Sequence, residues 1–226
     1  FHSKHFDLQM LSQDVYAAIA TDGGAAICNA GLIDLGGQIL VYDTFLTPRA
    51  AKDLSILSAE KFVHRPQLII NSHYHNDHIW GNQALLPKAQ ILSTTQTRNL
   101  ILTEGKLEYE WHAEHSKEKL QFYLEQQITT QNPDELENLK MWIGYYQGLA
   151  EAMTSLEVKV PAITFDDHLE IHGEKQTARL IEFIGGHTGS DTVLYLPQAG
   201  VVFMSDLLFV GCHPDLADGD PKQLMN

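Results

Sequence analysis

The sequence predicts a single α/β domain, because strand-like runs alternate with segments of helical periodicity along its 226 residues. Hydrophobic residues make up 44% of the chain, which is enough to bury a substantial core. Alternating apolar residues and paired glycines near the start are typical of an antiparallel meander, with strands expected at 6–11, 15–20, 26–33 and 38–42. We expect a strand–helix–strand unit next and a second group of strands near the end of the sequence.

The first helix is expected to begin after Thr47 and to continue to about Phe62, because Thr followed by Pro48 is typical of a capped helix start. The run at 68–70 is wholly apolar, as in a strand that is buried on both faces. The next expected elements are a short helix at 79–86 and a strand at 90–93.

The segment at about 94–156 is rich in Glu, Lys, Gln and Leu and lacks the alternation of a strand. We expect it to form an insert of two or three helices within a domain that spans residues 1–226. Asn132, Pro133 and Glu135 match a helix cap, a proline in the first turn and an acidic third position. Later strands are expected at 162–165, 169–172, 178–184, 192–196 and 201–204.

Composition disfavours several classes of partner. The formal net charge is −14, from 15 Lys and Arg against 29 Asp and Glu, so nucleic acid is not an expected partner. No apolar run approaches the roughly 18 residues of a membrane-spanning helix. Cys28 and Cys212 match neither a disulfide framework nor a thiolate zinc site, so we expect buried or bystander thiols. The sequence begins at Phe1, which leaves no signal sequence to examine, and we expect a soluble, cytoplasmic protein.

Three histidines and a carboxylate follow the apolar strand directly. His73 and His75 are two residues apart, so both side chains point to the same side of an extended chain. Asp77 and His78 come where the next helix begins and can face back toward them. A lone histidine is more often an ordinary loop or core residue, but several imidazoles beside a carboxylate are costly unless they are paired or bind a metal. The group therefore predicts a site for zinc or another first-row divalent ion.

Two later segments have the same character. His187 follows a predicted strand and two glycines, and Asp206 ends another apolar strand. Each signal is weak alone, because such residues are common at strand ends. Together they offer a further imidazole and a further carboxylate to the same site.

The His-x-His-x-Asp-His run, the Gly-His-Thr around His187 and the strand-end Asp206 together resemble the metallo-β-lactamase superfamily. Residues 29–31 and 41–44 also resemble its early strands, so the likeness covers nearly the whole chain. It implies a four-layer αβ/βα sandwich, in which two sheets covered by helices meet and hold two metals at one edge. The sequence stops before the last histidine-bearing segment usual in the family, so we expect an incomplete C-terminal part. This would leave a sheet edge exposed for pairing in a homo-oligomer.

The resemblance also implies a ligand set. It consists of His73, His75 and His187 for a first ion, Asp77 and His78 for a second ion, and Asp206 as a bridge between them. Two zinc ions are expected, with iron or manganese as alternatives. The family's further histidine has no clear counterpart, since His213 follows the last ligand too closely.

The expected activity is that of a hydrolase in which a metal-activated hydroxide attacks an ester, thioester, lactone or amide in a small-molecule substrate. Asp77 would position this nucleophile or handle its proton. Aspartate at position 206 resembles the glyoxalase II and lactonase branches, whereas the true β-lactamases generally have Cys or Ser there. Two alternatives stay open: a persulfide dioxygenase of the same fold that uses one iron, and a metal-binding module without catalysis.

Other polar and aromatic residues are weaker candidates. Asp43 either orients a metal-bound imidazole or is an ordinary residue at a strand end. His112 and His115 are interpreted as part of a solvated helix surface, and Asp166 and Asp167 as a turn. The aromatic residues interpreted as helical core rather than as a pocket lining are Trp111, Trp142, Tyr145 and Tyr146.

Overall fold

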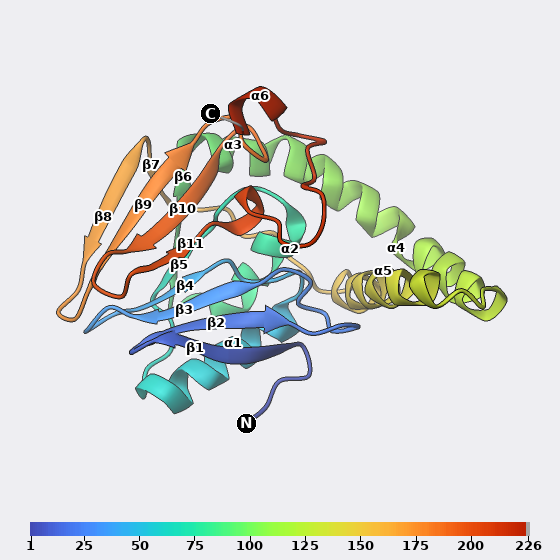
Figure 1. Ribbon diagram of the computed structural model, residues 1–226, viewed down its shortest axis with the longest axis horizontal. Helices are drawn as coiled ribbons and strands as arrows, with labels where there is room; N and C mark the ends of the chain where they lie inside the picture. Colours follow the sequence, from blue (N-terminus) through green and yellow to red (C-terminus); the bar gives the residue numbers. More distant parts are fainter. Residues whose placement is uncertain (225–226) are drawn as a thin grey trace.

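Two β-sheets pack against each other in the computed structural model, which describes residues 1–224 (Figure 1). The seven-stranded sheet has the order β1-β2-β3-β4-β5-β6-β7, and the four-stranded sheet has the order β11-β10-β9-β8. The strands of the larger sheet are β1 (Phe6–Ser12), β2 (Val15–Ala20), β3 (Ala30–Asp34), β4 (Ile39–Tyr42), β5 (Leu68–Ile70), β6 (Gln90–Thr94) and β7 (Ile163–Phe165). Those of the smaller sheet are β8 (His168–His172), β9 (Thr177–Phe183), β10 (Asp191–Leu196) and β11 (Val201–Phe203).

The larger sheet begins with the predicted antiparallel meander and continues with parallel strands. Strands β1 to β4 pair antiparallel, and β4 to β7 pair parallel. We expected the third strand to begin at residue 26, but it begins at Ala30. The physical reason is a tight turn, in which Ile27 has a positive φ of 70° and the Cys28 N–H donates to the Ala26 carbonyl over 3.0 Å.

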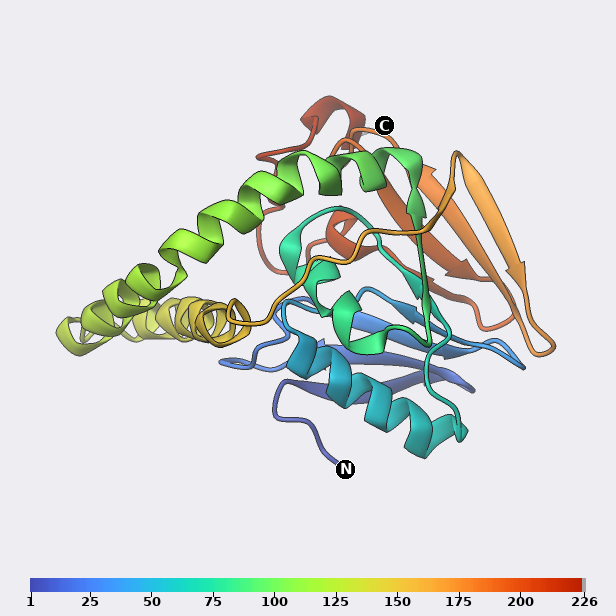
Figure 2. The same cartoon turned by 180° about the vertical axis from the view of Figure 1, so that it is seen from behind.

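Helix α1 (Pro48–Phe62) covers the outer face of the larger sheet (Figure 2). Its predicted start is confirmed, because the Thr47 side chain accepts a hydrogen bond from the Ala50 N–H and Pro48 occupies the first turn. Leu54 and Leu57 pack into an apolar cluster with residues of the sheet. Burial of such a side chain stabilises the fold by roughly 1.5–3 kcal/mol.

The two sheets share a second apolar core. Its buried residues include Leu40 and Tyr42 of β4 and Leu194 and Leu196 of β10. The Tyr42 hydroxyl donates to the Thr192 carbonyl over 2.5 Å, which joins the sheets directly. On the opposite face of the smaller sheet, several apolar side chains are exposed: Ile181, Phe183 and Val202. Strand β11 is the edge strand of this sheet in the described part of the chain, and its pairing with another chain stays a prediction.

The connection from β5 to β6 differs from the single helix expected at 79–86. It consists of α2 (Asn76–Ile79) and the 3-10 helix η1 (Trp80–Leu85). Gly81 packs so closely on the segment after β4 that an added Cβ would lie 1.8 Å from the Thr44 carbonyl oxygen. This contact holds the short helices against the end of β4.

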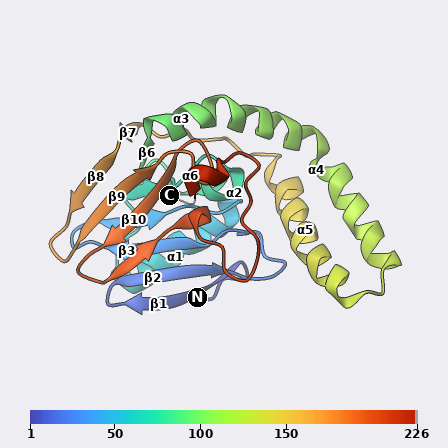
Figure 3. The same cartoon turned by 45° about the horizontal axis from the view of Figure 1, so that its top comes forward.

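Three helices lie between β6 and β7 in the sequence: α3 (Thr95–Leu102), α4 (Glu104–Thr129) and α5 (Pro133–Ala152). The last two form a hairpin that projects from the sheets (Figure 3). The predicted cap at Asn132 is confirmed, since its side chain accepts from the Asp134 N–H. The remaining short helices are η2 (Ser205–Leu207) and α6 (Pro221–Leu224). No helix within residues 1–224 is long and apolar enough to cross a membrane.

Candidate metal centre

The six predicted site residues converge where the two sheets meet. The larger sheet contributes the residues that follow β5, from His73 to His78. The smaller sheet contributes His187, which follows β9, and Asp206, which lies in η2 directly after β11. Side chains from three strand ends far apart in sequence therefore lie together, and their role as metal ligands stays a prediction.

Three imidazoles form the first cluster. The Nδ1 atom of His75 lies 3.1 Å from Nε2 of His73 and 3.0 Å from Nε2 of His187. His187 donates its Nδ1–H to the Asp215 carbonyl oxygen over 2.8 Å, which leaves its Nε2 with a lone pair in the neutral ring. His75 Nε2 lies 3.0 Å from the carboxylate of Asp218, which leaves its Nδ1 as the free nitrogen. Nitrogen lone pairs therefore face one another across this cluster.

This arrangement fits a bound cation. Burial, followed by the neighbouring His78, His75 and His187, lowers the pKa of His73 well below its usual value. Burial also lowers the pKa of His75. Neutral imidazoles that turn lone pairs toward one another repel, whereas a divalent ion between them would accept all three lone pairs. The donor set and its orientation therefore suit a metal with nitrogen ligands.

His78, Asp77 and Asp206 form a second cluster beside the first. His78 Nε2 lies 3.7 Å from Asp77 Oδ2 and 3.4 Å from Asp206 Oδ1, and it is buried with no hydrogen-bond partner among residues 1–224. Burial alone would lower the pKa of His78, but the Cys28 sulfur and the carboxylates of Asp77, Asp206 and Asp43 raise it well above its usual value. The acidic surroundings thus favour a positive charge at this position, which a proton or a metal ion would supply.

Asp206 lies between the two clusters. Its Oδ1 is 3.4 Å from His78 Nε2, and its Oδ2 is 3.7 Å from His187 Nε2. One carboxylate therefore faces both groups of imidazoles, and its role as a bridge between two ions stays a prediction. By contrast, His213 is exposed and belongs to none of the three potential ligand groups found among the described residues.

Asp43 supports the second cluster from behind. Its buried carboxylate accepts from His78 Nδ1–H over 2.9 Å and from the Ser72 hydroxyl over 2.7 Å. The Ser72 backbone N–H donates to the other carboxylate oxygen over 2.8 Å. Of the two interpretations of Asp43 from the sequence, the structure favours the one in which it orients an imidazole. It also fixes the proton of His78 on Nδ1 and directs Nε2 toward the carboxylates.

The sequence did not predict that Asp218 and Ser205 would lie at this centre. Asp218 carries no motif and reaches His75 only because the loop after η2 folds back over His187. Ser205 lies beside Asp43 and Ser72, with its hydroxyl 2.8 Å from that of Ser72. The only sequence signal for Ser205 was its position next to Asp206.

The interpretation of His112 as a solvated surface residue was wrong. Its side chain is buried, with Nε2 3.2 Å from the Tyr145 hydroxyl and its ring against Trp80. Burial, and then the nearby His115, lowers the pKa of His112 to about 4. The reason is that α4 packs its inner side on η1 and α5, so only its outer side meets solvent.

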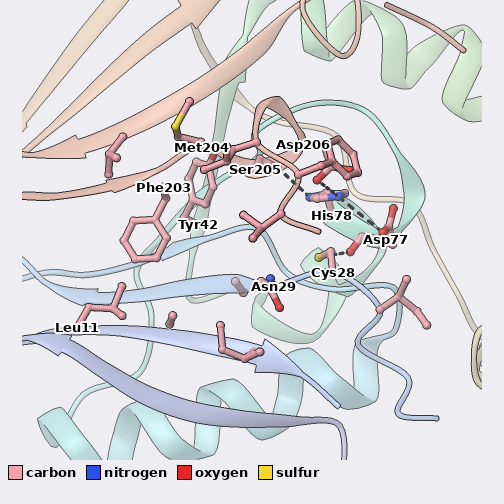
Figure 4. A pocket seen from close by; sticks show the side chains of 18 residues that line it. Leu11, Cys28, Asn29, Tyr42, Asp77, His78, Phe203, Met204, Ser205 and Asp206 are labelled. Atoms are coloured by element: carbon pink, nitrogen blue, oxygen red, sulfur yellow. Dashed lines mark hydrogen bonds and ion pairs between the residues drawn. The ribbon is translucent and has the colours of Figure 1, made fainter. Parts of the chain in front are cut away.

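Two pockets open onto the centre. The first, of about 630 Å³, lies between the sheets and reaches Cys28, Asp77, His78 and Asp206 (Figure 4). The second, of about 670 Å³, lies beneath the helical hairpin. Its lining includes His75, Asp77, His187, Asp206, Glu104, Glu108, Trp142, Tyr145, Phe209, Asp215 and Asp218. Trp142 and Tyr145, which we interpreted as core, therefore line a pocket, whereas Tyr146 is buried as predicted.

The fold and this centre define a class of protein: an α/β sandwich with imidazoles and carboxylates gathered where its two sheets meet. Residues 23–225 match the family described as the metallo-beta-lactamase superfamily. The chain belongs to this superfamily, whose members are typically metal-dependent hydrolases. The predicted metallo-β-lactamase fold is thereby confirmed.

Solved structures agree with this assignment. One similar structure is described as a metallo-beta-lactamase from Pontibacter korlensis, with a TM-score of 0.64, 16% identity and coverage of 97% of this chain and 81% of that chain. Another is described as a metallo beta lactamase from Hirschia baltica, with a TM-score of 0.63, 13% identity and coverage of 96% and 80%. At these identities the likeness concerns the fold alone. No curated protein matches the sequence in a direct comparison.

Proposed function

We propose that the chain is a hydrolase that uses two divalent metal ions, most suitably zinc, to cleave an ester, thioester, lactone or amide. The observation that carries this proposal is the approach of His73 Nε2 and His187 Nε2 to within 3.1 and 3.0 Å of His75 Nδ1, beside a second cluster that shares Asp206. The first ion would be held by His73, His75 and His187, the second by Asp77 and His78, and both by Asp206. The chemistry that bound divalent ions supply at such a site is activation of water and polarisation of a carbonyl group.

Asp77 is the residue proposed to handle the proton of the attacking water. Its carboxylate lines both pockets, so it can meet water and substrate. Burial raises the pKa of Asp77 above its usual value, although the neighbouring His78 opposes this. A carboxylate with a raised pKa is a better proton acceptor, which suits a general base.

The pocket beneath the hairpin favours substrates without a negative charge. Its lining includes Glu104, Glu108, Asp215 and Asp218 in addition to the proposed ligands, together with Trp142 and Tyr145. No lysine or arginine is among the described residues that line it. Apart from the proposed metal ions, a carboxylate or phosphate on the substrate would meet no cationic group there, so we expect small molecules that are neutral or cationic away from the scissile group and carry an apolar portion.

The test combines metal analysis with a panel of ester, thioester, lactone and amide substrates. We expect about two zinc ions per chain in the wild type, hydrolysis of at least one ester-like substrate, and loss of both metal and activity in His75→Ala. His168→Ala serves as a control, because that histidine is exposed at the start of β8, in the smaller sheet.

Three other outcomes would contradict the proposal, and each would indicate a different alternative. One iron per chain with oxygen uptake on a persulfide would indicate the dioxygenase alternative. Less than one metal per chain, without turnover on the panel, would indicate a binding module without catalysis. Unchanged metal content in His75→Ala would show that the imidazole cluster is not the metal site.

A further inference from the structure

The second cluster contains a nitrogen atom that lacks a partner. The side chain of His78 is 2% exposed, and its Nδ1–H is committed to Asp43. Its Nε2 atom is buried and forms no hydrogen bond with any residue that the structure describes. Such an atom is costly to bury unless a donor or a cation meets it. It faces Asp77 Oδ2 at 3.7 Å and Asp206 Oδ1 at 3.4 Å, so either a proton on Nε2 or a metal ion among the three groups would pair with these carboxylates.

Cys28 lies on the remaining side of this position. Ligand atoms of Cys28, Asp77 and His78 all lie within 4.8 Å of one another (Figure 4). The Cys28 side chain is buried, and its thiol donates to the Asp77 carbonyl oxygen over 2.7 Å. A sulfur, an oxygen and a nitrogen therefore lie close together, and Asp206 Oδ1 lies 3.4 Å from the same His78 nitrogen.

The backbone holds Cys28 in this place. Ile27 has a φ of 70°, a conformation that a β-branched residue adopts at a cost, and the Cys28 N–H closes the turn on the Ala26 carbonyl. The same carbonyl accepts from the Leu46 N–H over 2.9 Å, which anchors the turn to the chain that leaves β4. The turn that shortened β3 relative to the sequence prediction thus directs the thiol inward.

We propose that the Cys28 sulfur is a ligand of the second metal ion, completing the position formed by Asp77, His78 and Asp206. The inference rests on the proposed function, because it assumes that this position binds an ion. On binding, the S–H bond breaks, the sulfur donates an electron pair to the ion, and the proton passes to solvent.

The spacing of His78 and the two carboxylates suits a zinc ion. Zinc–sulfur and zinc–nitrogen bonds of roughly 2.3 and 2.0 Å place neighbouring ligand atoms of a tetrahedral ion roughly 3.3–3.8 Å apart. The distances from His78 Nε2 to the two carboxylates already have such values. Cys28 must exchange its hydrogen bond to the Asp77 carbonyl for the ion. A thiolate among the ligands would favour zinc over manganese or magnesium at this position.

Cobalt(II) substitution tests the proposal without substrate. Sulfur bound to cobalt gives a charge-transfer absorption in the near ultraviolet that nitrogen and oxygen ligands do not give. The chain has only two cysteines, and Cys212 is exposed, so Cys212→Ser leaves Cys28 as the sole thiol. We expect this variant, loaded with two equivalents of cobalt, to retain the band of the wild type.

The matched variant is Cys28→Ser, whose hydroxyl can keep the hydrogen bond to the Asp77 carbonyl. We expect it to lose the band and to bind the second cobalt equivalent at least about tenfold more weakly, with the first equivalent unchanged. Retained binding of the first equivalent shows that the variant folds.

Three results would overturn the proposal: no charge-transfer band in Cys212→Ser with two ions bound, unchanged affinity for the second ion in Cys28→Ser, or binding of fewer than two ions by the wild type. A wild type that shows the band but hydrolyses no substrate would instead contradict the proposed function alone.

Discussion

Asp43 is buried without contact to solvent, yet it ties together three groups of the candidate centre. Its carboxylate binds the His78 imidazole and both the hydroxyl and the backbone N–H of Ser72. A carboxylate that orients a ligating imidazole typically contributes a factor of about 10–100 to metal affinity.

Asp43→Asn is therefore expected to weaken metal binding about 10–100-fold, because the amide cannot hold the His78 proton on Nδ1 as a carboxylate does. Competition with a coloured chelator measures this affinity. Asp166→Asn, in the exposed turn before β8, is the control and should bind metal as the wild type does. Equal affinities in the two variants would show that Asp43 does not orient a ligand.

The protonation of Glu108 on α4 is expected to make the free energy of unfolding depend on pH. Burial, and then the charges of Asp77 and Asp218, raises the pKa of Glu108 to about 8. Between its usual pKa near 4.5 and this value, the folded chain binds more protons at this carboxyl than the unfolded chain does. This group therefore makes stability fall as the pH rises from 5 to 8.

We expect Glu108→Gln to remove this contribution, so that the free energy of unfolding of the variant relative to the wild type increases from pH 5 to pH 8. Urea denaturation at several pH values measures the difference. Glu110→Gln, an exposed neighbour on the same helix, should show no such trend. A difference that stays constant with pH would contradict the raised pKa.

The residues that the sequence could predict are those with a dense local signal. His73 to His78 form a motif within six positions, and their convergence with His187 and Asp206 follows from the resemblance. Cys28, Asp218 and Ser205 lack such a signal, because their approach to the centre depends on how loops fold in three dimensions. The interpretation of His112 failed for the same reason. Its neighbours in sequence are charged, but they do not show that this side of α4 packs against Trp80.

At the scale of elements, η1 packs through a glycine on α1 and on the chain that leaves β4. An added Cβ at Gly81 would lie 1.8 Å from the Thr44 carbonyl oxygen and 2.8 Å from the Ala51 Cβ. Neither neighbour can move away easily, because one is backbone and the other lies in α1. The contact also keeps Asp43, the residue before Thr44, within reach of His78.

Gly81→Ala should lower the free energy of unfolding by about 3 kcal/mol, at the upper end of typical overpacking costs. Gly105→Ala on α4 is a suitable control, since its Cβ would meet nothing closer than 3.6 Å and alanine favours helix. Chemical denaturation of both variants tests the prediction. Equal stability of the two would mean that η1 does not pack as described.

The helical hairpin is expected to govern substrate binding through Trp142. This side chain lines the pocket beneath the hairpin, whereas Trp111 of α4 does not. Trp142→Ala should raise KM about tenfold, the equivalent of roughly 1.4 kcal/mol of lost contact, with a smaller change in kcat. Steady-state kinetics on the best substrate of the panel measure this, with Trp111→Ala as the control. A change in kcat alone would argue against a role in binding.

Most elements could be predicted because their signals are local. The strand at 68–70 and the helix from Pro48 to Phe62 have the predicted bounds, since an apolar run and a Thr-Pro cap act within a few residues. The start of β3 and the division into α2 and η1 could not be predicted. They depend on the positive φ of Ile27 and on the contact of Gly81, which are consequences of tertiary packing.

For the whole molecule, the proposed ligands come from both sheets, so bound metal should stabilise the assembled fold. An ion present at about 1,000 times its dissociation constant would add about 4 kcal/mol to the stability of the folded chain. Removal by a chelator should therefore lower the melting temperature by on the order of 10 °C. Readdition of zinc should restore it. In His73→Ala the chelator should have little effect, and an equal loss in that variant would point to a metal bound elsewhere.

The hydrogen bond from Tyr42 to the Thr192 carbonyl lies in the interior between the sheets. The Thr192 N–H donates in turn to the Ser72 carbonyl, next to His73. The distances between the proposed ligands thus depend on how the two sheets are aligned. The sheets can shift relative to each other only if these hydrogen bonds break and the leucines packed around them rearrange. Changes in the interior, remote from any reacting atom, would therefore alter reactivity as well as rigidity.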